Sequence, residues 1–560
     1  MTESVMKYGA RKGRMSWLRR WIARASAKNI CIFPVPGADI LRYYQKNMQL
    51  NCTIAANPRE ANVLLVMGEM TEALALNAGV AYQQIPRPRV LVFAGPVQLP
   101  YLPEPDVQIS LSNGFIDEAL PQIRQRLKNQ AWSENAEPWV PDFLSEMLED
   151  SGNGGHDHHN HDHDNGGQKD DPHNHNGHNH SEHNHEGHED HNSETGHNHD
   201  HEHNHEGDHE GGGHDHGDMD FMSMVAMTKD LPRPKDGLPM NRSDVHFGPF
   251  HPGLPGGLSV FMELDGDTVI EANIENDLTA RSLDDLMLLE AKQLPDTLAR
   301  FNPLMPESYR LLARKALLNA SDDKSTTTFS SAELIQLESE RIGSHLNWLA
   351  TFAKTLGNEW LHQESARWHA AHRSEDMAPE KLLAFLEQIR TMPYLKTKLS
   401  VGGLIPDKLL HHLSGPAAKA TGKLEDARSS NEQYLSLDWA PITNTENNAW
   451  GRLLMRLEEI EQSLELINKA RRQESKTNDL SFSGSGERTA KLESPRGTLS
   501  LHITVENGKV TRVQIETPSK PLAALVPTLT EEEELSDALV QIASLDISPW
   551  EIELKGAGGE

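Results

Sequence analysis

The sequence predicts an α/β domain with a parallel sheet, then a disordered linker, then an α+β domain with a central helical bundle. Three observations predict this: apolar runs that end in glycine, a histidine-rich stretch without apolar side chains, and alternating hairpin patterns around amphipathic helices. We expect the parts to span residues 1–145, 146–230 and 231–560. A chain of 560 residues suffices for two or three domains, each with its own core.

The first domain is predicted from the order strand, helix, strand. Residues 62–68 (NVLLVMG) and 89–95 (RVLVFAG) are apolar runs typical of strands buried on both faces. Residues 69–85 between them have helical spacing, and a strand–helix–strand unit implies a parallel pair. Residues 115–130 are predicted to form a closing helix.

The N-terminal segment is strongly basic. Residues 7–28 carry eight lysines and arginines, and Glu3 is the one acidic residue before Asp39. With Trp17 and Trp21 among these cations, the segment is predicted to dock on a membrane surface or on a membrane-embedded partner. Packing of an ordinary terminal helix is the alternative. No run of about 18 apolar residues occurs, so we expect no membrane span.

The linker is predicted from its composition. Residues 151–218 contain no aliphatic or aromatic side chain and hold 21 of the 30 histidines. Such a segment cannot bury enough apolar surface to fold. It is also acidic, with Lys169 as its one basic residue, which argues against nucleic acid as a partner.

The same histidines are candidate metal ligands, because neutral imidazole suits zinc, nickel and cobalt. We expect a fluctuating, multi-ion site, and the alternative is a solvated tether whose histidines have no metal role. The candidate ligands are His156, His158, His159, His161, His163, His197, His199, His201, His203, His205, His214 and His216.

The C-terminal domain is predicted from two hairpins and two long helices. Residues 258–274 alternate around Asp265–Gly266, and residues 499–515 alternate around Asn507–Gly508. Between the hairpins, residues 331–357 and 450–470 show the apolar stripes of amphipathic helices.

Two ordered sets of motifs resemble a known family. Residues 57–95, and residues 16–29 before them, resemble the small B-type subunit of NADH:quinone oxidoreductase (respiratory complex I), which bears the terminal iron–sulfur cluster. Residues 247–257 (FGPFHPGLPGG) resemble the entry motif of the D-type subunit, a relative of the large subunit of nickel–iron hydrogenases. The D-type motifs include Gly248, Pro249, Gly402, Gly403, Glu493, Arg496 and Gly497, which are expected to be structural. The resemblance therefore implies a fusion of two subunits.

The resemblance also implies an iron–sulfur cluster that this sequence does not support. The family's adjacent cysteine pair falls at Pro36 and Gly37, and the other ligand positions fall within residues 94–97 and 111–116. None is a cysteine, and a cubane cluster needs four thiolates or close equivalents. Cys31 and Cys52, the two cysteines of the chain, lie outside these positions. We expect no cofactor in the globular domains, no nickel site, and a reducing compartment.

The quinone site implied by the resemblance is degenerate. His251 keeps the first histidine of the entry motif, whereas Pro255 replaces the second, which touches the quinone in the family. Residues 278–311 show no match to the segment that brings the partner tyrosine. Arg341 and His345 are assigned to the same region, with hydrogen bonding inside the bundle as the favoured role.

These features predict a peripheral-arm subunit of a complex-I-like assembly, on the cytoplasmic side of a membrane and next to an ion-translocating arm. We expect it not to be catalytic by itself, although the family uses NADH and quinone. A second hypothesis is an NADH:quinone oxidoreductase subunit with a remodelled quinone site. The main alternative is a divalent-metal chaperone or metal-transport accessory that works through the histidine-rich segment.

Overall fold

A computed structural model describes most of both predicted globular regions. The described residues are 16–44, 52–95, 99, 101–112, 114–129, 242–275, 278–318, 330–473 and 485–555. The histidine-rich segment with its candidate ligands, and the basic residues before position 16, lie outside this set. Among the described residues, no helix combines the length and apolar character that crossing a bilayer requires.

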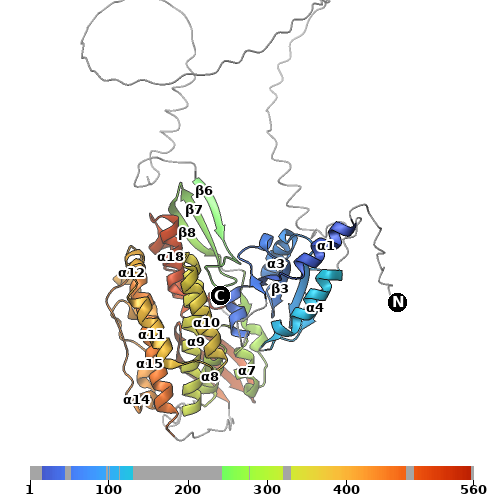
Figure 1. Cartoon of the computed structure of the whole chain (residues 1–560). Helices are drawn as coiled ribbons and strands as arrows, with labels where there is room; N and C mark the ends of the chain where they lie inside the picture. The colour runs from blue at the N-terminus through green and yellow to red at the C-terminus, as the bar shows by residue number, and fades with distance from the viewer. Residues whose placement is uncertain are drawn as a thin grey trace, which may run out of the picture. The chain divides into compact units, whose positions relative to one another are not determined.

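The N-terminal part is a five-stranded parallel sheet in the order β2-β1-β3-β4-β5 (Figure 1). The predicted strands at 62–68 and 89–95 are confirmed as β3 and β4, which pair in parallel with Val63 opposite Val90. The elements are α1 (Ser16–Ser26), β1 (Cys31–Val35), α2 (Ala38–Tyr44), β2 (Thr53–Ile54), β3 (Val63–Met67), α3 (Glu72–Gln84), β4 (Val90–Ala94), β5 (Val107–Ile109) and α4 (Phe115–Asn129).

The C-terminal part contains two antiparallel three-stranded sheets and a small parallel pair. Both predicted hairpins are confirmed, and Asn507 and Gly508 have φ of +51° and +78°, as a tight hairpin turn requires. The strands are β6 (Arg242–Phe247), β7 (Ser259–Asp265), β8 (Thr268–Glu275), β9 (Arg281–Ser282), β10 (Gly486–Ser494), β11 (Gly497–Glu506), β12 (Lys509–Glu516) and β13 (Leu554–Lys555).

Helices fill the space between these sheets, and both predicted long helices are confirmed as α9 and α15. α9 begins at a capping box, in which the Ser330 hydroxyl accepts the Glu333 N–H and the Glu333 carboxylate accepts the Ser330 N–H. The helices are α7 (Leu294–Leu298), α8 (Pro306–Leu318), α9 (Ser331–Thr355), α10 (Glu359–Arg373), α11 (Pro379–Arg390), α12 (Pro393–Leu399), α13 (Gly415–Lys419), α14 (Glu432–Leu435), α15 (Ala449–Ala470), α16 (Ser519–Ala523), α17 (Val526–Thr530) and α18 (Leu535–Leu545).

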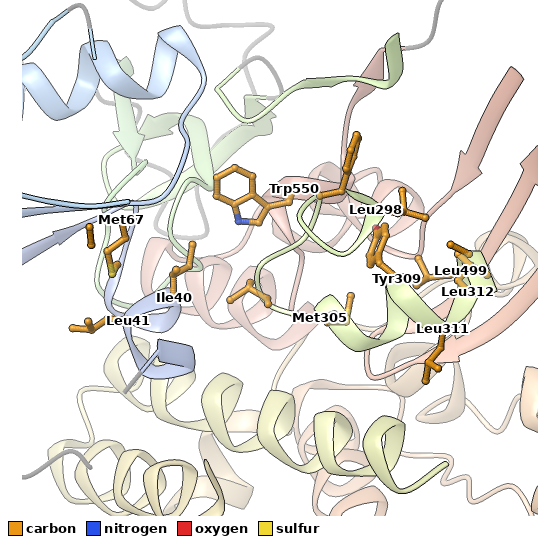
Figure 2. Packing of buried hydrophobic residues seen from close by; sticks show 14 of the residues in the cluster. Ile40, Leu41, Met67, Leu298, Met305, Tyr309, Leu311, Leu312, Leu499 and Trp550 are labelled. Atoms are coloured by element: carbon orange, nitrogen blue, oxygen red, sulfur yellow. The ribbon is translucent and has the colours of Figure 1, made fainter. Parts of the chain in front are cut away.

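One hydrophobic cluster runs through both parts. Ile40 and Met67 of the sheet layer belong to the same cluster as Leu298, Tyr309 and Trp550 (Figure 2). A second cluster covers the other face of the parallel sheet under α3. The two parts therefore form one compact unit rather than two domains with wholly separate cores, because one face of the sheet is shared.

Candidate functional site

The entry loop between β6 and β7 is held rigidly by glycine contacts and hydrogen bonds. Gly248 has φ of +123°, and a Cβ atom there would lie 2.1 Å from the Leu258 carbonyl oxygen, so only glycine fits. The Thr355 hydroxyl, at the end of α9, donates to the Gly253 carbonyl at 2.6 Å. The Pro249 carbonyl accepts the Gly257 N–H at 2.8 Å. These bonds fix the loop against the long helix.

His251 stabilises this loop. Its Nδ1 accepts the Gly253 N–H at 3.2 Å, and its ring lies edge-on to Phe247 with 5.7 Å between centroids. Burial lowers the pKa of His251, which favours the neutral imidazole that this acceptor role needs. These are the contacts of a turn residue.

The entry loop meets the parallel sheet at a backbone-to-backbone contact between Gly37 and Gly256. A Cβ atom on Gly37 would lie 2.6 Å from Asp39 Oδ1 and 2.7 Å from Gly256 Cα; one on Gly256 would lie 2.5 Å from the Pro36 carbonyl oxygen. Asp39 accepts the Gly256 N–H at 3.1 Å. We call this contact the glycine joint. In parallel sheets of this strand order, ligands bind outside the carboxyl ends of the strands near β1 and β3, and here the joint lies at the end of β1.

The residues at the joint do not fit an iron–sulfur cluster. Pro36 and Gly37 offer no thiolate, and neither do the other positions at which the resemblance places ligands. Cys31 begins β1, and Cys52 comes just before β2, so both cysteines lie at the amino ends of the strands, away from the joint. Burial raises the pKa of the Cys52 thiol to about 12, which disfavours the thiolate that a metal needs.

The pocket region around Pro255 is almost filled. Pro255 lines a void of about 10 Å³ together with side chains of α9 and the C-terminal turn. Such a volume is that of about one water molecule, so it is far too small for a quinone head group. The lining residues are Asp39, Gly253, Pro255, Asn347, Trp348, Thr351, Phe352, Arg496, Ala543 and Asp546.

Arg341 and His345 lie in the bundle, and neither lines the void at Pro255. Both are fully buried. The Arg341 guanidinium donates to the backbone carbonyls of Glu493 and Ser494, at 2.8 Å and 3.0 Å. His345 Nε2 lies 2.8 Å from the Glu459 carboxylate. The four residues that the sequence assigned to one region therefore divide between the entry loop and a buried ion network.

The turn that contains Glu493, Arg496 and Gly497 connects β10 to β11. Arg496 donates to the Asp546 carboxylate at 2.8 Å and to the Asp546 carbonyl at 3.0 Å. A Cβ atom on Gly497 would lie 2.5 Å from the Ser414 hydroxyl. This turn therefore packs tightly against the C-terminal helix region, an architectural arrangement.

Gly402 and Gly403 form a second tight loop. Both have φ of +65°, and a Cβ atom on Gly403 would lie 1.8 Å from Gln541 Oε1. The Gly403 carbonyl accepts a hydrogen bond from the buried Arg452 at 3.0 Å. Their role is to let the backbone approach α15 and α18.

Sequence reasoning missed a cavity of about 1070 Å³ at the carboxyl ends of β3 and β4, where Gly68 and Gly95 lie. Glu340 of α9 lines it and accepts the N–H groups of Glu307 and Ser308 at 2.7 Å and 2.8 Å, at the start of α8. Burial raises the pKa of Glu340 to about 7. This carboxyl can exchange a proton near neutral pH, but nothing in its local sequence distinguishes it from a surface glutamate.

Helix α1 presents an exposed apolar face. Trp17 and Trp21, one helical turn apart, are 68% and 64% exposed, while Ala23 and Ala27 are buried. Arg20 is exposed beside the tryptophans. The helix therefore combines bulky aromatic and cationic groups on its outer surface.

Comparison with known proteins identifies the C-terminal part. The model of the family described as "Respiratory-chain NADH dehydrogenase, 49 Kd subunit" matches residues 398–480 and 474–553. The chain thus contains a domain like the 49 kDa subunit of complex I, which is the D-type subunit of the bacterial enzymes. Both matched stretches include tight packing described above, at Gly402 and Gly403 and at the Arg496 turn.

Several named relatives agree. The first of the two D-type subunits of NADH-quinone oxidoreductase from Salinispora arenicola is 27% identical over 274 residues, which cover 40% of this chain and 61% of that protein. The D-type subunit of the same enzyme from Mycolicibacterium gilvum is 23% identical, over 54% of this chain and 88% of its own length. The chain therefore spans about 61% of the length of the first of these relatives.

A solved structure shares the fold. A chain of the membrane-bound sulfane sulfur reductase, an archaeal respiratory membrane complex, aligns with a TM-score of 0.50 and 19% identity. The alignment covers 56% of this chain and 98% of that chain.

Proposed function

We propose that this chain is a peripheral-arm subunit of a complex-I-like membrane assembly, and that it transmits conformational change to an ion-translocating arm without carrying electrons. The 49 kDa-like domain and the fold shared with a chain of a respiratory membrane complex support membership of such an assembly. The observation that carries the non-redox part is the glycine joint, which fills with backbone the position that the resemblance gives to the terminal cluster.

In this proposal the parallel-sheet part plays the role of the small B-type subunit, fused to its usual neighbour. Its support is the contact of α2 with α9 and α10: the Arg42 guanidinium donates to the Thr351 hydroxyl at 3.1 Å, and His369 Nε2 lies 3.1 Å from the Arg42 carbonyl. The Arg42 side chain is 5% exposed. A buried cation held between the two parts makes them move as one body.

The proposed membrane contact is α1, on the cytoplasmic side. Exposed tryptophans flanked by cations suit the interface between lipid head groups and acyl chains, or the equivalent edge of a membrane-embedded partner. The same arrangement would leave the 49 kDa-like domain in water, as its charged surface requires.

Purification from native membranes tests the assembly. The tagged wild-type chain is expected to co-purify with antiporter-like membrane proteins, whereas the double substitution Trp17→Ser and Trp21→Ser releases it to the soluble fraction. Trp360→Ser, at a tryptophan of α10 that is 41% exposed, is the matched control and should stay bound. A wild-type chain that purifies alone contradicts the proposal.

Metal analysis tests the non-redox role separately. Anaerobically purified chain is expected to hold far less than one iron per molecule. Bound iron with acid-labile sulfide would restore the redox reading. Iron-free protein that still supports quinone reduction by NADH would favour the remodelled quinone site instead.

The second candidate function is that of a divalent-metal chaperone or metal-transport accessory. The observation that favours it is the gathering of 21 of 30 histidines in residues 151–218, with acidic neighbours. Deleting these residues discriminates between the two roles. Loss of function confined to zinc, nickel or cobalt limitation or excess supports the metal role, and no effect supports a simple tether.

A further inference from the structure

The 49 kDa-like domain encloses a network of eight ionisable side chains from α9, α13, α15, β10 and the short 3-10 helix Ala427–Ser430 with its N-cap Asp426. All have side chains that are at most 2% exposed. The members are Glu338, Arg341, His345, Lys419, Asp426, Arg428, Glu459 and Glu493.

Three cations in the network are matched by three carboxylates. Arg341 bonds to Glu338 at 3.2 Å, and Arg428 bonds to Asp426 at 2.8 Å. The third cation, Lys419, has its Nζ 2.8 Å from Glu459.

The remaining members are His345 and Glu493. Burial lowers the pKa of His345, so the imidazole is the neutral donor to Glu459. The fourth carboxyl, that of Glu493, is left without a cation of its own.

The geometry around Glu493 agrees with this count. Lys419 Nζ lies 2.5 Å from Asp426 and 2.8 Å from Glu459, but 3.6 Å from Glu493 Oε1. Glu493 Oε2 accepts the Thr498 hydroxyl at 2.7 Å and the Ala427 N–H at 3.3 Å. Within the described residues Oε1 has no hydrogen-bond partner. An ionised Glu493 would be an uncompensated buried charge, which is far costlier than a neutral acid.

We propose that Glu493 binds one proton at neutral pH and that the network is a one-proton store inside the helical bundle. When the proton leaves, it passes from the Glu493 carboxyl to water, no other bond changes, and the new carboxylate attracts Lys419 away from Glu459. The Arg341 bond to the Glu493 carbonyl then links this change to α9.

The groups that face Glu493 set its proton affinity. Burial, then the nearby Asp426 carboxylate, raise the pKa of Glu493, while Lys419, Arg428 and the Thr498 hydroxyl oppose that rise. The same turn carries Arg496, which lines the void beside Pro255. Loss of the proton is therefore placed to alter the packing next to the glycine joint.

Infrared difference spectroscopy of the full-length chain, wild type against Glu493→Gln, tests the proton. We expect the substitution to remove a carbonyl band of a protonated carboxyl and to leave Tm within about 3 °C of the wild type, because glutamine resembles a neutral acid. The matched control Glu459→Gln should instead remove carboxylate bands. It should also lower Tm by more than about 5 °C, since Lys419 loses a partner.

Two results overturn the proposal. If Glu493→Gln removes carboxylate bands, or removes no protonated-carboxyl band, Glu493 is ionised. If Glu493→Gln does not fold, the negative charge is required, and Glu493 is an ion-pair partner rather than a proton store.

Discussion

The Gly256 N–H donates to the Asp39 carboxylate at 3.1 Å, so a helix of the parallel sheet holds the entry loop of the 49 kDa-like domain. Burial raises the pKa of Asp39, and the Gly256 N–H with the nearby Arg42 opposes this rise. Because the bond depends on Gly37 and Gly256 lacking side chains, it also indicates where the chain tolerates least change.

Gly256→Ala is expected to destabilise the protein by about 1–3 kcal/mol, because its Cβ would lie 2.5 Å from the Pro36 carbonyl oxygen and the backbone must move. Gly343→Ala is the matched control. That glycine lies inside α9, and its Cβ would meet no atom closer than 3.5 Å, so helix propensity should make it stabilising by up to about 1 kcal/mol. Urea denaturation measures both. Equal effects would contradict the glycine joint.

Glu340 should make stability depend on pH. Its pKa is raised to about 7 in the folded chain, against about 4.3 in unfolded chains, so its contribution is complete below pH 4.3 and is lost as pH rises through 7. The loss amounts to roughly 3 kcal/mol. Unfolding free energies measured between pH 4 and 8 should show this slope in the wild type but not in Glu340→Gln. Glu387→Gln, at an exposed carboxylate, should keep the slope; an unchanged slope in Glu340→Gln would refute the assignment.

Asp546 should be needed for its charge more than for its backbone conformation. It has φ of +59° and accepts Arg496 through both its carboxylate and its carbonyl. Asp546→Asn keeps a residue that tolerates this conformation but leaves Arg496 without its anion, which should cost about 3–5 kcal/mol. Arg496→Met combined with Asp546→Asn should cost less than the sum of the two single changes. Additive losses in calorimetry would show that the pair is not coupled.

Deletion of residues 151–218 should abolish uptake of several zinc or nickel ions per chain, as measured by calorimetry at neutral pH. Lowering the pH to 5 should weaken uptake by the intact chain in the same way, since protonated imidazole cannot bind a metal. The melting temperature of the deleted chain should match that of the wild type. Equal metal uptake by both chains would remove the segment from consideration as a metal site.

Sequence patterns were sufficient for elements whose neighbours are local. β3, β4 and both hairpins were predictable because alternation, apolar runs and Asn507–Gly508 encode them directly. β1 was missed; its run CIFPV is short and contains Pro34, which lowers strand propensity. α10 to α12 were also not anticipated, since their apolar stripes are interrupted by polar residues that face water.

The candidate site was less accessible to sequence reasoning. Loss of the cluster thiolates can be read from Pro36 and Gly37, but the backbone contact that replaces them joins segments far apart in the chain. Glu340 and Glu493 have ordinary neighbours in sequence. Their raised pKa values come from burial among groups on other elements, which no local pattern encodes.

The shared hydrophobic cluster of Figure 2 means that the two parts bind each other through their own surfaces. The intervening segment then acts by raising effective concentration rather than by supplying contacts. A chain cleaved between residues 147 and 231 should therefore remain a tight complex of two fragments. Separately expressed fragments should find each other, as proteins encoded by two genes would.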